Sequence, residues 1–407
     1  MLTLAGATLI DGTGRDPVEN THVVIDGTRI HDRAPSGRTL DLTGLTLLPG
    51  LIDAHVHLFG AGLSLDDVAG GKVSTAEVAA GMFRAAEQAL QSGFTTLRDC
   101  GGADGGLVRA IKSGLVRGPR LLVAGPILAQ TGGHGHFGSP FCSGNAWAAP
   151  GLGQISLVCD GPDQVTRAAR TAFRRGADFL KMCVTGGVLS HSDSLSDTQF
   201  THHEIRAAVR EADARGTYVT VHAHNSEGVR AAVLAGARCV EHGSFLDEET
   251  RSLMARHRTA LVPTLTAARL LAEDAGRIGV HTDIAARAEG MEAAMAESLR
   301  RAAAAGVPVG SGSDLLGGAP RRHGLELALK ADIIGPMAAI TSATSVNARI
   351  LGLDHLLGTV QPGKTADLIA IDGDPLTDPG LFDDPASVVL VVKDGRIVKD
   401  TQHLLTS

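Results

Sequence analysis

Two histidines lie one residue apart in the apolar segment GLIDAHVHLFG, residues 50–60. Successive side chains of a β-strand point to opposite faces, so His55 and His57 are predicted to project from the same face of a buried strand. A second such pair, His222 and His224, occurs in VTVHAHN. Imidazole nitrogens are frequent metal ligands, and a pair on one face indicates a metal site more strongly than an isolated histidine does.

Three further side chains that could take part in chemistry lie near the ends of short apolar runs. They are Lys181 in DFLKMCV, His242 in CVEHGS and Asp314 in GSGSD. A lysine inside a buried strand is costly unless it is neutralised or paired. Asp314 alone could equally cap the helix that follows it, and a single histidine at a strand end is more often structural than a ligand. The chemistry is therefore indicated by the set and not by any one member.

Strands and helices alternate along residues 50–358, and this alternation must position these side chains. Amphipathic stretches such as THHEIRAAVREADARG are followed by short apolar runs such as TYVTVHAH. About eight such units predict an α/β fold with a closed (β/α)₈ TIM-like barrel, and an open doubly wound sheet is the rival. In a parallel barrel the carboxyl ends of all strands meet at one rim, which would gather residues that are far apart in sequence.

Both ends of the chain have a different pattern. Residues 1–49 and 359–407 contain short β-type runs, such as THVVIDGTRI and SVVLVVKDGRIVKD, separated by turn residues. We expect these two segments to pair into one small β-sandwich domain beside the barrel domain of residues 50–358.

The composition limits the partners and the compartment. The formal net charge is −7 and no basic cluster occurs, which argues against nucleic acid and membrane surfaces as partners. The five cysteines form no C-x-x-C pair, so neither a disulfide framework nor a cysteine zinc site is indicated. The first residues lack the pattern of a signal peptide, and no apolar stretch approaches the roughly 20 residues of a membrane span. A cytoplasmic location is expected.

One long segment interrupts the alternation. Residues 129–160 are rich in Gly, Pro and Ser and exceed the length of an ordinary connection, which favours a functional loop. The loop contains His134 and His136 within TGGHGHFG. Neither this run nor GSGSDLLGG matches a phosphate-binding fingerprint, so the glycines are expected to let the backbone approach a substrate or a metal. The alternative is a glycine-rich turn whose histidines are solvated.

These motifs together resemble the amidohydrolase superfamily of metal-dependent hydrolases. The resemblance extends over nearly the whole chain and rests on LLPGLIDAHVHL, the strand-borne Lys181, His222, His242, Asp314 and the closing GTVQPGKTADLIAIDGDP. The chain looks most like the imidazolonepropionase-related group that includes Xaa-Pro dipeptidases (prolidases), lysine/arginine carboxypeptidases and ochratoxin-type amidases, in which a TGGHG loop like residues 131–135 occurs. The resemblance implies a (β/α)₈ barrel with a β-sandwich from both chain ends, and we also expect a homo-oligomer.

The resemblance further implies a pair of Zn²⁺ ions or another divalent metal pair. The implied ligands are His55, His57 and Asp314 for the first metal, His222 and His242 for the second, and N6-carboxylated Lys181 as the bridge between them. Carboxylation of Lys181 by carbon dioxide would replace a costly buried cation by a bidentate anion.

The implied reaction is cleavage of an amide or peptide bond in a small substrate, such as an N-acyl amino acid or an Xaa-Pro dipeptide. A hydroxide that bridges the metals would attack, with Asp314 as proton shuttle and His134 as the hydrogen-bond partner of the oxyanion. His136 is nearly as suitable as His134. The residues expected at the substrate are His134, His136, His224 and Arg321. Arg321 in APRRHG could anchor a carboxylate, although a solvated surface pair with Arg322 is the simpler interpretation.

Two other functions stay open. A deaminase or a cyclic-amide hydrolase of the imidazolonepropionase type would use the same scaffold, and Glu227 has the spacing from His224 that a one-metal deaminase of the superfamily uses. Glu227 is instead expected to begin the next helix, where an acidic residue is electrostatically favourable. A non-catalytic descendant of such enzymes would typically have lost metal ligands, and the complete set argues against it.

Overall fold

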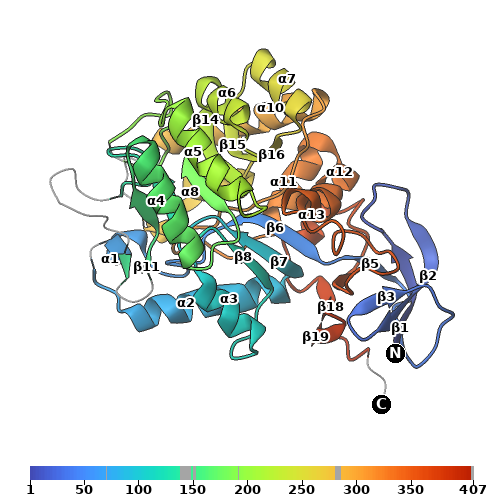
Figure 1. Ribbon diagram of the computed structural model, residues 1–407. Helices are drawn as coiled ribbons and strands as arrows, with labels where there is room; N and C mark the ends of the chain where they lie inside the picture. The colour runs from blue at the N-terminus through green and yellow to red at the C-terminus, as the bar shows by residue number, and fades with distance from the viewer. Residues whose placement is uncertain (70, 138–147, 150–152, 191, 280–285, 405–407) are drawn as a thin grey trace.

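The computed structural model contains a region built on a mixed β-sheet and a region of parallel strands covered by helices (Figure 1). It describes residues 1–69, 71–137, 148–149, 153–190, 192–279 and 286–404. Both ends of the described chain lie with the mixed sheet (Figure 1).

Segments from the two ends of the chain lie side by side in the mixed sheet. The strand order is β19-β18-β17-β5-β1-β2-β3, with β4 paired to β1, and β5 pairs antiparallel with β17. The strands of this sheet are β1 (Leu2–Leu9), β2 (Val18–Asp26), β3 (Arg29–His31), β4 (Arg38–Asp41), β5 (Leu45–Pro49), β17 (Leu368–Asp372), β18 (Val388–Lys393) and β19 (Arg396–Asp400).

Alternate residues of β17 pack on the two faces of the mixed sheet. Leu368 and Ala370 belong to the core formed by the mixed sheet itself. Ile369 and Ile371 belong to the core that extends into the helical region. This alternation has the two-residue period of a strand, and it packs the sheet against the rest of the chain.

Two parallel sheets form the centre of the other region. Their strand orders are β6-β7-β8 and β12-β9-β13-β14-β15-β16. The strands are β6 (Leu51–Val56), β7 (Phe94–Asp99), β8 (Arg120–Val123), β9 (Ile127–Ala129), β12 (Ser156–Val158), β13 (Leu180–Cys183), β14 (Val219–Asn225), β15 (Cys239–Phe245) and β16 (Ala260–Val262), and a separate pair is formed by β10 (Ala148–Ala149) and β11 (Gly153–Gln154). Strands β6, β7 and β13 are buried along their whole length, and β6 and β13 are largely apolar, as buried parallel strands usually are.

Hydrogen bonds connect both edges of the three-stranded sheet, β8 and β6, to the segments beside the six-stranded sheet. At one edge, the Asp178 N–H donates to the Val123 carbonyl at 2.8 Å. At the other edge, residues 307–314 lie between β16 and β6. There the Gly310 N–H donates to the Leu261 carbonyl and the Ala54 N–H donates to the Ser311 carbonyl, each at 2.8 Å.

The segment VPVGSGSD, residues 307–314, is the clearest local difference from the expected alternation of helices and strands, because it does not form a regular strand. It makes an isolated bridge, between Val309 and Leu261. Pro308 has no N–H to donate to a ladder, and glycines weaken a strand. Gly312 is needed for the close packing here, because a Cβ at this position would lie 2.5 Å from the Cβ of His55.

Helices follow the strands, which confirms the predicted α/β alternation. They are α1 (Leu65–Ala69), α2 (Thr75–Gln91), α3 (Gly105–Lys112), α4 (Gly161–Arg174), α5 (His202–Asp213), α6 (Ser226–Ala235), α7 (Glu248–His257), α8 (Leu265–Ile278), α10 (Met291–Ala304), α11 (Leu325–Ile334), α12 (Pro336–Thr341) and α13 (Asn347–Ile350), with a π-helical turn (Ser342–Val346) and a 3₁₀ helix (Pro379–Phe382). Capping boxes begin α2, with Ser74 and Glu77, and α5, with Thr201 and Glu204. Within the described residues, none of the helices combines the length and the apolarity that crossing a bilayer requires.

Candidate metal centre

The side chains singled out from the sequence meet at one pocket beside the parallel strands. The pocket is lined by every metal ligand that the sequence led us to expect, namely His55, His57, Lys181, His222, His242 and Asp314. The ring centroids of His55 and His242 are 5.2 Å apart, and those of His222 and His242 are 4.5 Å apart. Residues from five separate segments of the chain therefore lie within contact distance of a small ligand.

His55 and His57 hold their Nε2 atoms 3.3 Å apart. The other nitrogen of each ring already has a partner: His55 Nδ1 lies 2.8 Å from Glu241 Oε2, and His57 Nδ1 lies 2.9 Å from the Gly101 carbonyl oxygen. A carboxylate and a carbonyl both require a donating N–H, so in the neutral rings both Nε2 atoms carry lone pairs. Two facing lone pairs repel each other unless a cation binds both, which is how histidines oriented by a neighbouring acceptor bind metals.

Asp314 completes a group of three possible ligands with these histidines. Its Oδ1 lies 3.4 Å from His55 Nε2 and 3.5 Å from His57 Nε2. This oxygen is buried and has no hydrogen-bond partner among the described residues. The ligand atoms of the three residues lie within 4.8 Å of one another. Because an unpaired buried acceptor is costly and a divalent cation would satisfy it, these residues fit a metal ion.

The backbone at the site is strained at three residues that are not glycine. Thr264, His242 and Asp314 have φ angles of 58°, 70° and 50°. His242 Nδ1 lies 2.7 Å from Thr264 Oγ1 and 4.0 Å from Asp314 Oδ2, so the strained residues are neighbours. Such conformations cost about 1–3 kcal/mol each and occur where the surrounding structure holds a side chain in a required direction. Their clustering supports a functional role for this pocket.

Burial keeps the histidines of the pocket neutral. It lowers the pKa of His57 to about 4 and the pKa values of His134 and His224 to about 3, and the positive charge of Lys181 acts in the same direction. Burial is also the main cause that lowers the pKa values of the remaining three, His55, His222 and His242. Neutral imidazole is the form that binds metals, so these rings can accept a cation near pH 7 without first losing a proton.

Glu241 and Arg98 form a buried ion pair next to His55, and neither residue was predicted from the sequence to belong to the site. Glu241 Oε2 accepts a hydrogen bond from His55, and Oε1 accepts one from Arg98 at 2.6 Å. Burial opposes the charge of Glu241, but Arg98 and His55 outweigh it and lower the pKa of this carboxyl. The available signal was a carboxylate inside the apolar run CVEHGS, because a buried glutamate needs a partner.

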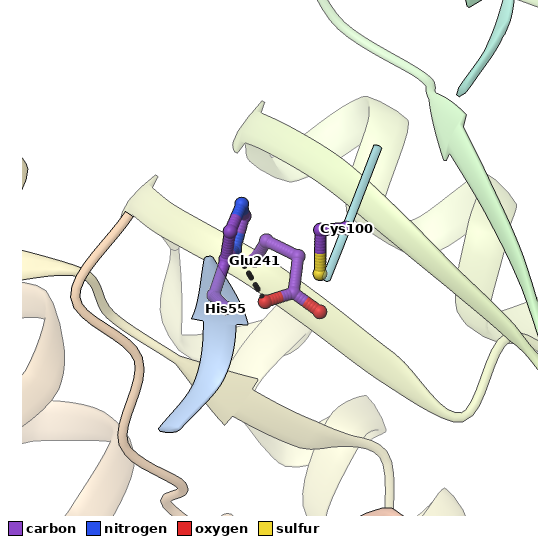
Figure 2. Close-up of side chains that lie close together, drawn as sticks. All are labelled: His55, Cys100 and Glu241. Atoms are coloured by element: carbon purple, nitrogen blue, oxygen red, sulfur yellow. Dashed lines mark hydrogen bonds and ion pairs between the residues drawn. The ribbon is translucent and has the colours of Figure 1, made fainter. Parts of the chain in front are cut away.

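His55, Cys100 and Glu241 also lie close enough together to hold a cation (Figure 2). Both oxygens of Glu241 are already hydrogen-bonded, however. Burial raises the pKa of the Cys100 thiol far above its usual value, and the thiolate is the form of cysteine that binds metals. This cluster therefore orients His55 and does not form a second metal site.

The glycine-rich loop brings His134 into the pocket, whereas His136 is not among the lining residues. The His134 ring stacks on the His222 ring with a centroid distance of 4.1 Å. Gly187 permits this position, because a Cβ there would lie 2.4 Å from the His134 ring. His136 Nδ1 accepts a hydrogen bond from the Gly132 N–H instead. Residues 138–147 and 150–152 of this loop lie outside the described residues.

Asp193 positions His134 through the side chains of Ser190 and Gln199, an arrangement that the sequence did not indicate. Ser190 Oγ donates to Asp193 Oδ1 and lies 3.0 Å from His134 Nδ1. Gln199 donates to Asp193 Oδ2 at 2.9 Å and accepts from the His134 backbone N–H at 2.9 Å. Because Ser190 gives its single hydroxyl hydrogen to the carboxylate, His134 must donate through Nδ1. Nε2 is then the ring nitrogen available to a ligand.

The remaining residues considered at the substrate occupy different places. His224 lines the pocket, and its Nδ1 lies 2.8 Å from Ser244 Oγ. Arg321 does not line this pocket: its guanidinium donates to the Gly317 carbonyl at 2.6 Å and borders a separate pocket. Glu227 is exposed in the first turn of α6, which confirms that it begins this helix.

Comparison with known proteins assigns the chain to a family. The model of the amidohydrolase family matches residues 46–398. Ochratoxinase from Aspergillus niger is 32% identical over 365 residues, which cover 87% of this chain and 75% of that protein. An uncharacterised protein from Mycobacterium tuberculosis is 28% identical over 380 residues, which cover 90% of each chain.

Solved structures agree with the sequence matches. A prolidase in complex with N-methylphosphonate-L-proline has a TM-score of 0.92 at 35% identity, over 98% of this chain and 99% of that one. A Xaa-Pro dipeptidase with methionine bound in its active site has a TM-score of 0.88 at 33% identity, with the same coverage of both chains. These neighbours imply a TIM-barrel-type α/β fold. The chain therefore belongs to the amidohydrolase family, in the group of Xaa-Pro dipeptidases and ochratoxin amidases, and is a hydrolase that acts on amide C–N bonds.

Proposed function

We propose that this hydrolase cleaves the amide bonds of small substrates, such as N-acyl amino acids or Xaa-Pro dipeptides, with two Zn²⁺ ions or another divalent pair as cofactor. The observation that carries the proposal is the convergence of His55 Nε2, His57 Nε2 and Asp314 Oδ1. Histidine nitrogens and carboxylate oxygens are the ligands that catalytic zinc uses. The similarity to a prolidase and to ochratoxinase supports the substrate class.

The proposed ligand set has two halves and a bridge. Its members are His55, His57 and Asp314 for one metal, His222 and His242 for the other, and Lys181 between them. Lys181 is only 2% exposed, and its charge acts on all the histidines of the pocket. Its neutral amine would add carbon dioxide to form a carbamate and release a proton. An ammonium at this position would repel metal ions, whereas the carbamate would attract them and supply oxygen ligands.

The residues of the chain have separate tasks in the proposed reaction. When bound, the metals supply a Lewis acid that polarises the scissile carbonyl and lowers the pKa of the attacking water. Asp314 takes a proton from that water and passes it to the leaving amine. His134 hydrogen-bonds the carbonyl oxygen through Nε2. The ring is neutral, so its hydrogen must lie on Nε2 in the substrate complex, with the Ser190 hydroxyl turned to donate to Nδ1.

His224 lines the same pocket and would contact the substrate. His136 and Arg321 do not line it, and we assign neither a role in this arrangement.

We also propose the domain organisation that this function requires. Residues 50–358 would form the hydrolase domain, with the parallel strands closed into a (β/α)₈ barrel, and residues 1–49 and 359–407 would form a β-sandwich domain. The hydrogen bonds at both edges of the parallel sheets and the pairing of β5 with β17 support this division. The described cysteines are free thiols, which supports a reducing compartment such as the cytoplasm.

Deamination or cyclic-amide hydrolysis is the second candidate function. The exposure of Glu227 on α6 weighs against a one-metal deaminase, because the carboxylate that would serve the substrate lies outside the pocket.

Metal analysis together with product analysis tests the proposal. Purified, zinc-loaded protein should hold two metal ions per chain and release a free amino acid from N-acyl amino acids or Xaa-Pro dipeptides. Asp314→Asn should bind zinc more weakly but still hold it at saturating zinc, while kcat falls by about 10²-fold or more because the proton shuttle is lost. A near-normal kcat would exclude this role for Asp314. One metal per chain with release of ammonia would favour the deaminase.

A further inference from the structure

The pocket that contains the metal-type ligands has a second set of lining side chains, and these are apolar. They come from α8, from α10 and from the segment that follows Asp314, and they include Leu270, Leu271, Met291, Met295, Leu315 and Leu316. Leu270 is 4% exposed and Met295 is 3% exposed, so other protein atoms hold these side chains in place. Methionine adapts its shape to different apolar partners, and two methionines in one wall are typical of a surface that receives an apolar group.

Charge in this pocket is confined to the metal end. Among the described lining residues, the acidic and basic side chains are six histidines, Lys181 and Asp314, and all belong to the cluster described above. Arg277, in the last turn of α8, and Arg321, which follows Asp314 in the sequence, line a different pocket together with Glu77 and Arg84. The only tyrosine of the chain, Tyr218, precedes β14 and stacks on Phe179. The described apolar wall therefore offers no partner to a charged group.

We propose that the wall formed by α8, α10 and residues 315–319 is the subsite for one of the two groups that flank the scissile amide, and that this group is a bulky aliphatic or aromatic one. This inference rests on the proposed amide hydrolysis and names its substrate class. An apolar group gains free energy in proportion to the area that it buries against the wall. An ammonium or carboxylate placed there loses its hydration and finds no partner, so it is rejected.

Matched substrates test the inference on the zinc-loaded enzyme. Two series of N-acyl amino acids and dipeptides are compared, one for each side of the scissile amide. In each series the side chain on that side is Ala, Leu, Phe, Asp or Lys, and the other side stays constant. In one series kcat/KM should rise by about tenfold or more from Ala to Leu or Phe. In that series kcat/KM for the Asp and Lys substrates should be lower than kcat/KM for the Ala substrate. The proposed subsite would be wrong if, in both series, kcat/KM for the Asp and Lys substrates equals kcat/KM for the Leu substrate.

Substitutions in the wall locate the subsite. Leu271→Asp should lower the ratio of kcat/KM for the Leu substrate to that for the Ala substrate by about tenfold, because it places a charge in the wall. Leu234→Asp is the matched control, since Leu234 is 59% exposed on α6, and it should leave the ratio unchanged. If Leu271→Asp does not fold, Met295→Ala provides the test. The smaller side chain enlarges the pocket, so the preference should shift toward bulkier groups. An unchanged ratio in a folded, metal-loaded wall variant would overturn the inference.

The two proposals fail in different ways. If the metal-loaded protein hydrolyses none of the amides, the proposed function is wrong. If it hydrolyses them without an apolar preference on either side, only the subsite is wrong.

Discussion

His55 and His57 hold their Nε2 atoms 3.3 Å apart, while Glu241 and the Gly101 carbonyl fix the hydrogen of each ring at Nδ1. The hydrogen bonds on the far side of each ring thus determine the chemistry on the near side, since only lone pairs remain there. A cation that binds between the rings relieves the repulsion of these lone pairs. The proposed metal site therefore has a basis that does not depend on similarity to other proteins.

Metal binding should weaken as the pH falls below about 8. Burial raises the pKa of Asp314 to about 8 in the metal-free chain, although the charge of Lys181 opposes the shift. Below this pH the carboxyl group keeps its proton and must lose it to bind a metal, so each further pH unit should raise the apparent Kd by about tenfold. Calorimetric zinc titrations in buffers of different ionisation enthalpy would count the released protons. A Kd that stays constant between about pH 6 and 8 would contradict this assignment.

Lys181→Ala should abolish turnover and reduce the bound metal. The substitution removes the amine that would carry the carbamate, so the metals lose their shared ligand. A short-chain carboxylate such as acetate or propionate should partly restore activity, because it can supply the missing oxygens. The test is to measure the metal content and kcat of the variant, each with and without the added carboxylate. Full turnover by the wild-type protein with no carboxylated lysine in its mass spectrum would rule out the bridge.

Glu241→Gln should destabilise the protein by about 3–5 kcal/mol, because it leaves the fully buried Arg98 without its counter-charge. Zinc affinity should also fall by about 10–100-fold, since His55 loses the carboxylate that orients it. Urea unfolding of the metal-free protein and zinc titration measure the two effects. Glu211→Gln is the control, because its partner Arg170 is 65% exposed, and we expect a change of about 1 kcal/mol or less. Equal losses of stability and of zinc affinity in the two variants would contradict a special role for the buried Glu241–Arg98 pair.

Asp193→Asn should lower kcat by about 10²-fold while the metal content stays the same. An amide in place of the carboxylate no longer accepts from both Ser190 and Gln199, so the His134 ring loses its position at the carbonyl oxygen. KM should change by less than kcat, because His134 acts on the reacting carbonyl. Asp197→Asn, an exposed position in the same loop, should leave kcat, KM and the metal content unchanged. Parallel losses of metal and activity in Asp193→Asn would instead indicate damage to the ligands.

Much of the fold could be predicted from the sequence, because the period of the apolar residues encodes it. The alternation of THHEIRAAVREADARG and TYVTVHAH became α5 and β14. The glycine-rich VPVGSGSD deviated from a regular strand because Pro308 and the glycines favour close packing over a regular ladder.

The candidate ligands were visible in the sequence for a related reason. Polar residues such as His55, Lys181 and His242 stand out in strands that are otherwise apolar, and burying them needs an explanation.

What only the tertiary structure decided is which side chains support the ligands and which face the pocket. The contact of Glu241 with His55 spans 186 positions, and that of Ser190 with His134 spans 56. The same loop carries His134 and His136 two residues apart, yet only His134 enters the pocket, because Gly187 gives its ring space. The spacing of residues in the sequence predicts whether a segment is a helix or a strand. It does not predict where loops direct their side chains once the strands have packed. Those directions determine the partners of each polar group.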